Sequence, residues 1–389
     1  MTGTARIIQG DARQLPLPDN SVDLICTSPP YFALRSYTDG GEHYDGQIGS
    51  ETTPAEFLDA LLVVTRECMR VLKPQGSLFV NLGDKYADKS LMGMPWRYAL
   101  ACIDQLGLIL RAEIIWSKPN GLPESVQDRV RRSHEQWFHF TLQPRYYAAV
   151  DEIREPQEGG VVTNGQAKRG RGFGGDSLAS GTFSKDGGFN AYREERGINY
   201  NPLGKLPGSV WTIPSQPLVV PPELGVDHFA AYPMEWPRRI IQGWTPNGIC
   251  VECGEGRRPA ANQEYLEGRK NGTQKYGGGN GDGFTAATAW AAMPSLKSSV
   301  TITGYICGCP EPTAPTAPAV VLDPFGGTGT TALIAKALGR TGISIDLSAD
   351  YCRLAEWRCN DPAQLAQALQ VEKPEPIPDG QMSLFGDAL

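Results

Sequence analysis

Apolar residues along the chain gather in short runs that end on glycine, proline or a polar residue. One run occupies 22–27 and ends on a Ser-Pro-Pro-Tyr tetrad. A second run at 320–322 leads through a glycine-rich turn into an alanine- and leucine-rich stretch at 332–338, and a third run at 341–345 ends on Asp346. Short apolar runs bounded by turn residues predict buried strands, and the longer stretch predicts a helix. The pattern therefore predicts an α/β protein.

The tetrad at 28–31 directly follows the first run. Its two adjacent prolines lack backbone donors and fix their φ angles, so the strand must end in a stiff, extended corner. Such a corner holds a small polar side chain, carbonyl oxygens and an aromatic ring close together. These groups can grip an exocyclic amino group while the ring stacks on the base that carries it. The same residues also suit an ordinary Pro-Pro turn after a strand, so the tetrad alone leaves both interpretations open.

The glycine-rich turn at 323–331 indicates a ligand site at the start of a helix. Glycines let the backbone approach a ligand closely, and a helix N-terminus offers unpaired N–H groups. Asp346 ends the following strand, roughly twenty residues past the glycines, where an acidic side chain suits the hydroxyls of a ribose. A dinucleotide-binding unit for NAD or FAD is the alternative. The pattern here is F-G-G-T-G-T rather than G-x-G-x-x-G, which favours a nucleoside without phosphates.

Together the two segments resemble the amino-group DNA methyltransferases that use S-adenosylmethionine. T-S-P-P-Y at 27–31 matches the catalytic motif of that family, and D-P-F-G-G-T-G-T at 323–330 matches its cofactor motif. The catalytic motif comes first in the chain, as in the circularly permuted β group of the family. Five further segments resemble family segments in the same order, and these are 10–23, 76–84, 114–120, 132–135 and 228–233.

The resemblance implies a fold and a set of site residues. The expected fold is a Rossmann-like, circularly permuted methyltransferase domain with a mostly parallel seven-stranded sheet and helices on both faces. The implied catalytic residues are Ser28, Pro29, Pro30 and Tyr31. The implied cofactor-binding residues are Asp11, Thr27, Ser28, Asp323, Phe325, Gly326, Gly327, Thr328, Gly329, Thr330, Asp346 and His228.

The chemistry that the resemblance implies is a direct methyl transfer without a cysteine nucleophile. Ser28 Oγ and the Pro29 carbonyl would accept the two N–H bonds of the amino group, and Tyr31 would stack on a base flipped out of duplex DNA. A serine at the first tetrad position accompanies cytosine N4 as the target in this family. We therefore expect site-specific cytosine-N4 methylation, with adenine-N6 methylation as the alternative. A non-catalytic, zinc-containing DNA-binding protein is the alternative from another class.

Charge alone does not indicate DNA binding, because the chain of 389 residues has a net charge of -7. Phosphate contacts depend on local positive charge. The candidate DNA-binding residues are Arg35, Arg131, Arg132, Lys168, Arg169 and Arg171. A solvated surface is the other interpretation of such a basic cluster. Basic and aromatic residues alternate within 151–208, a glycine-rich stretch where the family carries its target-recognition region. This stretch is also typical of a surface loop, and the two interpretations agree if it orders only on DNA.

Nine cysteines in a chain without an evident export signal predict a reducing, cytoplasmic location. Five of them fall in the expected strands and helices and are predicted to be buried. The other four, Cys250, Cys253, Cys307 and Cys309, form a C-x2-C…C-x-C set in an insert at 249–318. Four thiolates on tight turns can surround a structural zinc ion. Two unrelated cysteine pairs or a labile disulfide are the alternatives.

The sequence thus predicts six segments. The catalytic half of the domain is 1–150, the recognition region 151–208, a return to the core 209–248, the zinc-binding insert 249–318, the cofactor-binding half 319–360 and a tail 361–389. No apolar run approaches the ~20 residues of a membrane span. The resemblance implies double-stranded DNA as the partner, with or without a cognate restriction endonuclease. The oligomeric state stays open.

Overall fold

The computed structural model describes residues 3–33, 38–39, 42–43, 46–121, 123–156, 203–226, 231–266, 297–309 and 314–373. Five predicted site residues lie outside these ranges, namely Arg35, Lys168, Arg169, Arg171 and His228. The chain divides into two compact units. The first consists of Met1–Ile153, Gly208–Arg258 and Tyr305–Leu389, and the second of Arg154–Pro207 and Pro259–Gly304. The expected recognition region and the middle of the expected insert therefore belong to one unit.

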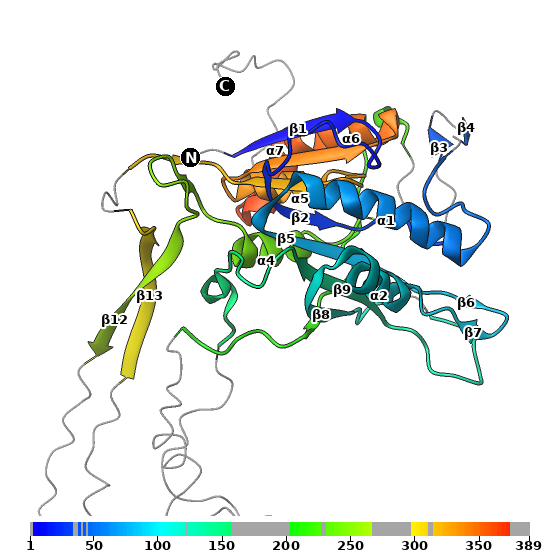
Figure 1. Ribbon diagram of the computed structural model, residues 1–389, viewed down its shortest axis with the longest axis horizontal. Helices are drawn as coiled ribbons and strands as arrows, with labels where there is room; N and C mark the ends of the chain where they lie inside the picture. The colour runs from blue at the N-terminus through cyan, green and yellow to red at the C-terminus, as the bar shows by residue number, and fades with distance from the viewer. Residues whose placement is uncertain are drawn as a thin grey trace, which may run out of the picture. The chain divides into compact units, whose positions relative to one another are not determined.

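An eight-stranded sheet forms the centre of the first unit (Figure 1). Its order is β1 (Thr4–Gln9), β16 (Thr341–Asp346), β15 (Val320–Asp323), β2 (Val22–Thr27), β5 (Leu72–Leu82), β9 (His134–Thr141), β8 (Ile109–Ser117) and β10 (Val210–Thr212). All neighbouring strands are parallel except at β9, which runs antiparallel to both β5 and β8. The predicted strands at 22–27, 320–322 and 341–345 are all present.

The prediction of seven strands was wrong by one, because β10 adds an edge strand beside β8. Val210, Trp211 and Thr212 pair with the last three residues of β8. Trp211 is buried between two exposed neighbours, and its ring stacks on that of Trp236 with 4.9 Å between centroids. The large ring on the covered face accounts for the extra strand, since one well-placed aromatic side chain can anchor a short edge strand.

Helices cover both faces of the sheet, as predicted. Their bounds are α1 (Pro54–Val71), α2 (Met94–Leu106), α4 (Glu235–Trp244), α5 (Thr330–Ala337), α6 (Ala349–Asn360) and α7 (Pro362–Leu369), with short 3-10 helices at Val150–Ile153 and Pro222–Leu224. Four pairs of strands form separate small sheets: β3 (Thr38–Asp39) with β4 (Glu42–His43), β6 (Tyr86–Ala87) with β7 (Ser90–Leu91), β11 (Ile249–Cys250) with β14 (Thr316–Ala317), and β12 (Arg258–Leu266) with β13 (Lys297–Ile306).

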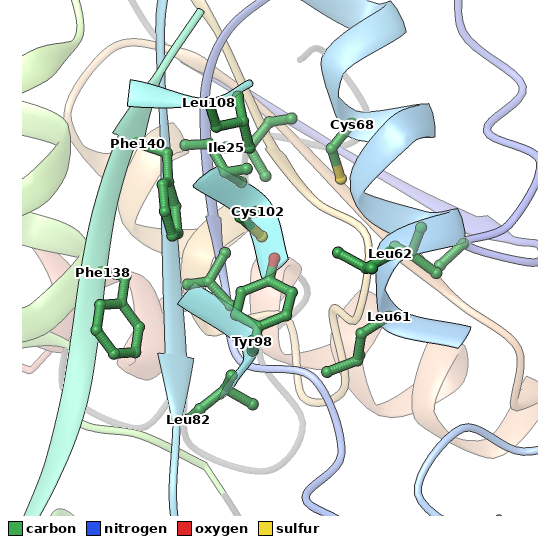
Figure 2. Packing of buried hydrophobic residues seen from close by; sticks show 14 of the residues in the cluster. Ile25, Leu61, Leu62, Cys68, Leu82, Tyr98, Cys102, Leu108, Phe138 and Phe140 are labelled. Carbon is green, nitrogen blue, oxygen red and sulfur yellow. The ribbon is translucent and has the colours of Figure 1, made fainter. Parts of the chain in front are cut away.

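Alternation along the central strands divides the core in two. On β5, Leu78 and Val80 face one side of the sheet and Phe79 the other. The first side packs against α1 and α2, where Leu62 and Tyr98 meet the strand residues (Figure 2). The second side packs against α4 and α5. Period-two alternation of this kind is what a strand buried on both faces produces, and it fixes the positions of the loops at the strand ends.

The tail predicted from 361 onward begins with a packed helix instead. Asp361 caps α7 by accepting a hydrogen bond from the Gln364 backbone N–H at 2.8 Å, and Pro362 occupies the first turn. Ala366 and Ala368 are buried against the core. An aspartate followed by proline is a typical helix start, and this signal was missed because the surrounding sequence is rich in proline and charge.

Candidate active site

A cavity of about 940 Å³ opens where the parallel strands of the first unit end. Its wall contains the segments that follow β1, β2, β15 and β16 at their carboxyl ends, the usual place for ligand sites in such sheets. The predicted site residues on this wall are Asp11, Ser28, Pro29, Pro30, Tyr31, Phe325, Gly326, Gly327, Thr328, Thr330 and Asp346. The fold therefore brings the two motifs, which lie at opposite ends of the chain, to one place.

Asp323 is buried beneath the cavity rather than on its wall. Its carboxylate, 1% exposed, accepts hydrogen bonds from Thr27 Oγ1 at 2.6 Å and from Tyr232 OH at 2.8 Å. Thr331 Oγ1 and the Phe325 backbone N–H donate to it as well, at 2.9 and 3.2 Å. Burial raises the pKa of this carboxyl, and these hydrogen bonds oppose the rise. Asp323 thus joins β15 to β2 and fixes the base of both motifs.

Two other predicted cofactor residues also lie off the cavity wall. Thr27 is 3% exposed and directs its hydroxyl to Asp323. Gly329 is the N-cap of α5 with φ +73, and a Cβ there would lie 2.9 Å from Ala355 Cβ. Only glycine combines this left-handed conformation with such a close approach between helices. Both residues therefore shape the loop from below.

Asp346 ends β16 at the cavity wall and organises the glycine-rich loop. Its Oδ2 accepts a hydrogen bond from the Gly327 N–H at 2.8 Å, and its Oδ1 accepts one from the Ser348 N–H at 2.9 Å. Gly326 lies so close to β16 that a Cβ would stand 1.8 Å from Ser344 Oγ. The loop is therefore held flat against the strand, and the carboxylate is held in one orientation beside it.

Arg358 on α6 holds the same loop from the protein interior. The side chain is 3% exposed and donates to both Thr328 Oγ1 and Thr330 Oγ1 at 2.7 Å. Burial lowers its pKa to about 10, so the guanidinium remains charged at neutral pH. No local pattern indicates this role, because an arginine on a helix more often faces solvent.

Asn81, near the end of β5, orients the Ser-Pro-Pro-Tyr corner. Its Nδ2 donates to the Gln136 carbonyl at 3.1 Å, which places Oδ1 toward the cavity. Ser28 Oγ donates to this Oδ1 at 3.3 Å, and Tyr31 OH lies 2.7 Å from it. A hydroxyl has one proton and two lone pairs. Because the Ser28 proton points at Asn81, its lone pairs are available as acceptors.

Tyr31 is also fixed at its hydroxyl and along its ring. The hydroxyl lies 2.8 Å from Glu135 Oε2, and Glu135 Oε1 forms an ion pair with Lys118. The Lys118 ammonium lies 4.0 Å from the centroid of the Trp116 ring, a cation–π contact. Gly83 packs so tightly on Tyr31 that a Cβ would lie 2.4 Å from its Cε2.

Three members of this network were not among the predicted site residues: Asn81, Lys118 and Glu135. Each falls in a segment that resembles the family, at 76–84, 114–120 and 132–135 respectively. Those segments were the available signal, but a resemblance of short segments does not assign partners to individual side chains.

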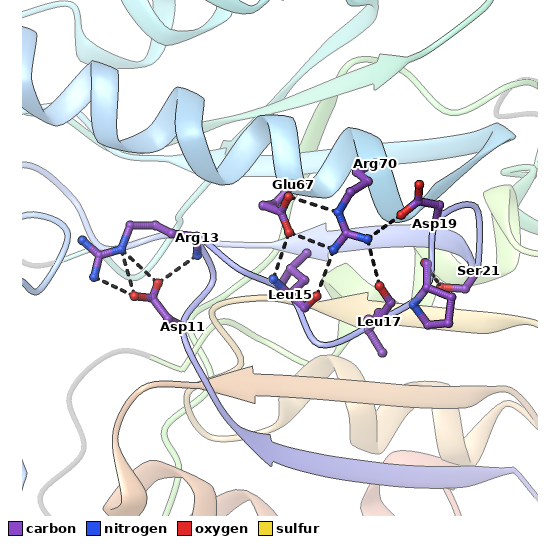
Figure 3. Close-up of polar contacts among 9 residues, drawn as sticks. Asp11, Arg13, Leu15, Leu17, Asp19, Ser21, Glu67 and Arg70 are labelled. Atoms are coloured by element: carbon purple, nitrogen blue, oxygen red, sulfur yellow. Dashed lines mark hydrogen bonds and ion pairs between the residues drawn. The ribbon is translucent and has the colours of Figure 1, made fainter.

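Asp11 also lines the cavity, in a loop that α1 holds in place (Figure 3). Arg13 binds its carboxylate with Nη2 at 2.6 Å from Oδ2. Partial burial alone would raise the pKa of Asp11, but the hydrogen bonds and charge of Arg13 lower it. Further along the loop, Arg70 donates to the Leu15 carbonyl at 2.9 Å and binds Glu67 at 2.8 Å. These bonds fix the lead-in to β2.

The two predicted DNA-binding arginines in the described chain have different environments. Arg131 is exposed and donates to the Gly121 carbonyl at 2.9 Å. The Arg132 side chain is 13% exposed, with Nη1 3.4 Å from Asp84 and Nη2 3.0 Å from Gln136 Oε1. Arg132 lines the cavity and belongs to its wall rather than to an open basic surface.

The four predicted metal ligands come together, and the five remaining cysteines do not join them. The sulfurs of Cys250, Cys253, Cys307 and Cys309 all lie within 4.8 Å of one another. The other five, Cys26, Cys68, Cys102, Cys352 and Cys359, are buried as predicted.

A model of the family described as DNA methylase, of the N6/N4 type, matches residues 22–251 and 316–356. The matched residues include both motif segments and most of the cavity wall. The chain belongs to this DNA methylase family. Within the described part of this methylase, no helix combines the length and apolar character that crossing a membrane requires.

Relatives of the methylase share parts of the chain. It is 38% identical over 189 residues to the type II methyltransferase M.XycI of Xanthomonas campestris pv. cyanopsidis, which covers 41% of this chain and 61% of the relative. It is 30% identical over 252 residues to M.BglII of Bacillus subtilis, covering 64% of this chain and 58% of that protein. The matched regions thus span about three fifths of these relatives.

Among solved structures, the methylase resembles the PvuII DNA methyltransferase, which is described as cytosine-N4-specific. The TM-score is 0.53 at 17% sequence identity, and the match covers 95% of this chain and 94% of the other. At this identity the likeness shows a shared methyltransferase fold.

Proposed function

We propose that this protein is a site-specific DNA methyltransferase that transfers a methyl group from S-adenosylmethionine to the N4 amino group of cytosine in duplex DNA. One observation carries the proposal. Ser28 and Tyr31 line the same cavity as Asp346 and the glycine-rich loop. A methyl donor and an extruded base would therefore meet in one cavity.

The residues of the cavity fit the cofactor. The acidic Asp346 suits the ribose hydroxyls, because its carboxylate is already oriented by the Gly327 and Ser348 backbone N–H groups. Phe325 and Asp11 would contact the adenine end. The cavity of about 940 Å³ lies at the upper end of the ~300–1,000 Å³ range of ligand sites. When bound, the cofactor supplies an electrophilic methyl group on a sulfonium.

The chain's own contribution is to prepare the amino nitrogen. Its lone pair is delocalised into the base, which makes it a weak nucleophile. Ser28 Oγ and the Pro29 carbonyl would accept its two N–H bonds and favour a pyramidal nitrogen with its lone pair directed at the methyl. The hydrogen bond from Ser28 to Asn81 supports this role, because it leaves the hydroxyl as an acceptor. Alignment of the reacting atoms then lowers the barrier.

Tyr31 would stack on the extruded base. Its hydroxyl contacts to Asn81 and Glu135 and its packing against Gly83 hold the ring in advance of binding. A ring that is already fixed loses little conformational entropy on stacking. Lys118, through its ion pair with Glu135, holds this support in place.

Chain order supports a circularly permuted domain. The neighbouring strands β2 and β15 carry the catalytic and cofactor motifs, yet β2 comes near the start of the chain and β15 near its end. The type II relatives support modification of a specific DNA sequence, with or without a cognate restriction endonuclease. We assign DNA contacts to Arg131, to Arg132 on the cavity wall and, in the segments outside the described residues, to Arg35, Lys168, Arg169 and Arg171. A cytoplasmic location accords with this substrate.

Nucleoside analysis, for the modified base, and methylome sequencing, for its sequence context, test the proposal. DNA from cells that express the wild type should contain N4-methylcytosine in one sequence context. Ser28→Ala should slow transfer on the order of a hundredfold and leave cofactor affinity unchanged. Ser21→Ala, at the residue just before β2, is the matched control and should transfer at the wild-type rate. N6-methyladenine in place of N4-methylcytosine would correct the base, and a protein that binds no cofactor in calorimetry would be a non-catalytic binding module.

A further inference from the structure

Two tight turns carry the four clustered cysteines. In the first turn the Gly254 N–H donates to the Cys250 carbonyl and the Cys250 N–H donates to the Glu255 carbonyl, both at 2.9 Å. Gly254 has φ +70, which glycine adopts without strain. The turn closes at a bridge between Ile249 and Gly256. This reversal brings Cys250 and Cys253 to one side.

The second turn, at 307–309, is attached to the first. The Gly308 N–H donates to Glu255 Oε2 at 3.1 Å, and a Cβ at Gly308 would lie 3.3 Å from the same oxygen. Glu255 therefore holds the two turns face to face without contributing a ligand. All four sulfurs lie within 4.8 Å of one another. Zn–S bonds of about 2.3 Å in a tetrahedron place the sulfurs about 3.8 Å apart, so small side-chain movements complete the geometry.

We propose that Cys250, Cys253, Cys307 and Cys309 bind one structural zinc ion. Four thiolates select a soft, tetrahedral metal, and they leave no coordination position open for water or substrate. The proposal does not depend on the methyltransferase activity.

The position of the site explains what the metal stabilises. Cys250 belongs to β11, which pairs with β14 immediately before the cofactor strand β15. The first unit is interrupted between Arg258 and Tyr305, and the two cysteine pairs lie on either side of that interruption. A metal bound by both pairs joins the segment that leaves the unit to the segment that returns to it. The metal thereby fixes the segment that leads into β15. Few apolar side chains are available in that segment to hold it by packing.

Metal analysis of the full chain, purified without a metal-affinity step, tests the site. One zinc per chain is expected, and replacement by cobalt should give the intense visible bands and thiolate charge-transfer bands of a tetrahedral tetrathiolate. Cys253→Ser and Cys309→Ser should lose the metal. Cys68→Ala is the matched control, because Cys68 is buried in α1, and it should retain one equivalent.

The same experiment distinguishes the alternatives. Protein that is metal-free and shows no tetrathiolate spectrum with cobalt would overturn the proposal, as would a mass about 4 Da lower that reveals two disulfides. Iron in place of zinc would overturn the choice of metal. If a cysteine variant fails to fold, the wild type is treated with a chelator instead. Release of one zinc together with new protease cuts near 249–309 supports the site. Unchanged cleavage with no metal released refutes it.

Discussion

Replacing Glu135 by glutamine tests whether its ion pair with Lys118 supports the Ser-Pro-Pro-Tyr corner through Tyr31. Tyr31 and Lys118 contact different carboxylate oxygens of Glu135. Glutamine keeps only one acceptor oxygen and carries no charge, so it cannot accept from both groups at separate oxygens and cannot form the ion pair with Lys118. The Glu135 and Lys118 side chains are 17% and 22% exposed. Exposed pairs contribute about 0–1 kcal/mol, while removing one partner of a buried pair costs about 3–5 kcal/mol. For this mostly buried pair we expect a loss of about 2 kcal/mol, or about thirtyfold in an equilibrium constant.

Chemical denaturation of four proteins measures the effect: the wild type, Glu135→Gln, Lys118→Met and the double variant. Each single change should lower the free energy of unfolding by about 2 kcal/mol. The double variant should lose about the same amount of stability rather than twice as much. Once the first substitution has broken the ion pair, the second substitution has no ion pair left to break. Single-turnover methylation by Glu135→Gln should be about tenfold slower, with unchanged cofactor affinity.

Glu113→Gln is the matched control for this cycle. Glu113 is a partly buried carboxyl on the neighbouring strand β8, and burial raises its pKa. Neutralising it should therefore change the free energy of unfolding by less than about 1 kcal/mol. Strictly additive losses in the double variant, or a Glu135→Gln protein as stable and active as the wild type, would refute the coupling between the ion pair and the corner.

Three further outcomes are expected. Asp346→Ala should weaken S-adenosylmethionine binding in calorimetry by about tenfold to 150-fold, the value of a charge-assisted hydrogen bond. A variant that binds the cofactor as tightly as the wild type would show that Asp346 does not hold the ribose. Tyr31→Phe should keep the 2-aminopurine signal of a stacked base, whereas Tyr31→Ala should lose about 1–3 kcal/mol of stacking; equal signals would assign stacking to another ring. Burial, with the nearby Arg111 charge, lowers the pKa of His139 to about 3. Below pH 6.5 the imidazole therefore binds a proton in the unfolded chain but stays neutral in the folded chain. The stability due to this neutral imidazole is complete above pH 6.5 and lost as the pH falls toward 3, by about 1.4 kcal/mol per pH unit; a His139→Gln protein with the same slope between pH 6 and 4 would contradict this.

Local patterns explain why much of the fold and part of the site could be predicted. The apolar run at 22–27 and the glycines at 326–329 act within a few residues, so the sequence displays them directly. The tetrad is similar, because two prolines determine their own backbone. Cys250 and Cys253 are also readable, since their spacing and the following glycine suffice to suggest a turn with two thiols.

Roles that depend on distant partners could not be predicted. Asp323 stands in the cofactor motif but faces Thr27 and Tyr232, which only the finished sheet brings within reach. Arg358 is an ordinary helix arginine until α6 packs beneath the glycine-rich loop. The edge strand β10 depends on a place for Trp211 beside Trp236, which no local pattern encodes. The packed start of α7 is different, because its capping signal was present and was outweighed by composition.

The hydrogen bond from Thr27 to Asp323 spans 296 residues of sequence, and this separation has a consequence for synthesis. Strand β2 receives one neighbour from β5 soon after it is made, but its other edge waits for β15. At about 5–20 residues per second, that wait on the ribosome lasts about 15–60 s. During this time an apolar strand edge is open to pairing with other chains. The growing chain is thus a natural client for a chaperone, and nascent chains halted before 320 should aggregate while those halted beyond the sheet's last strand should not.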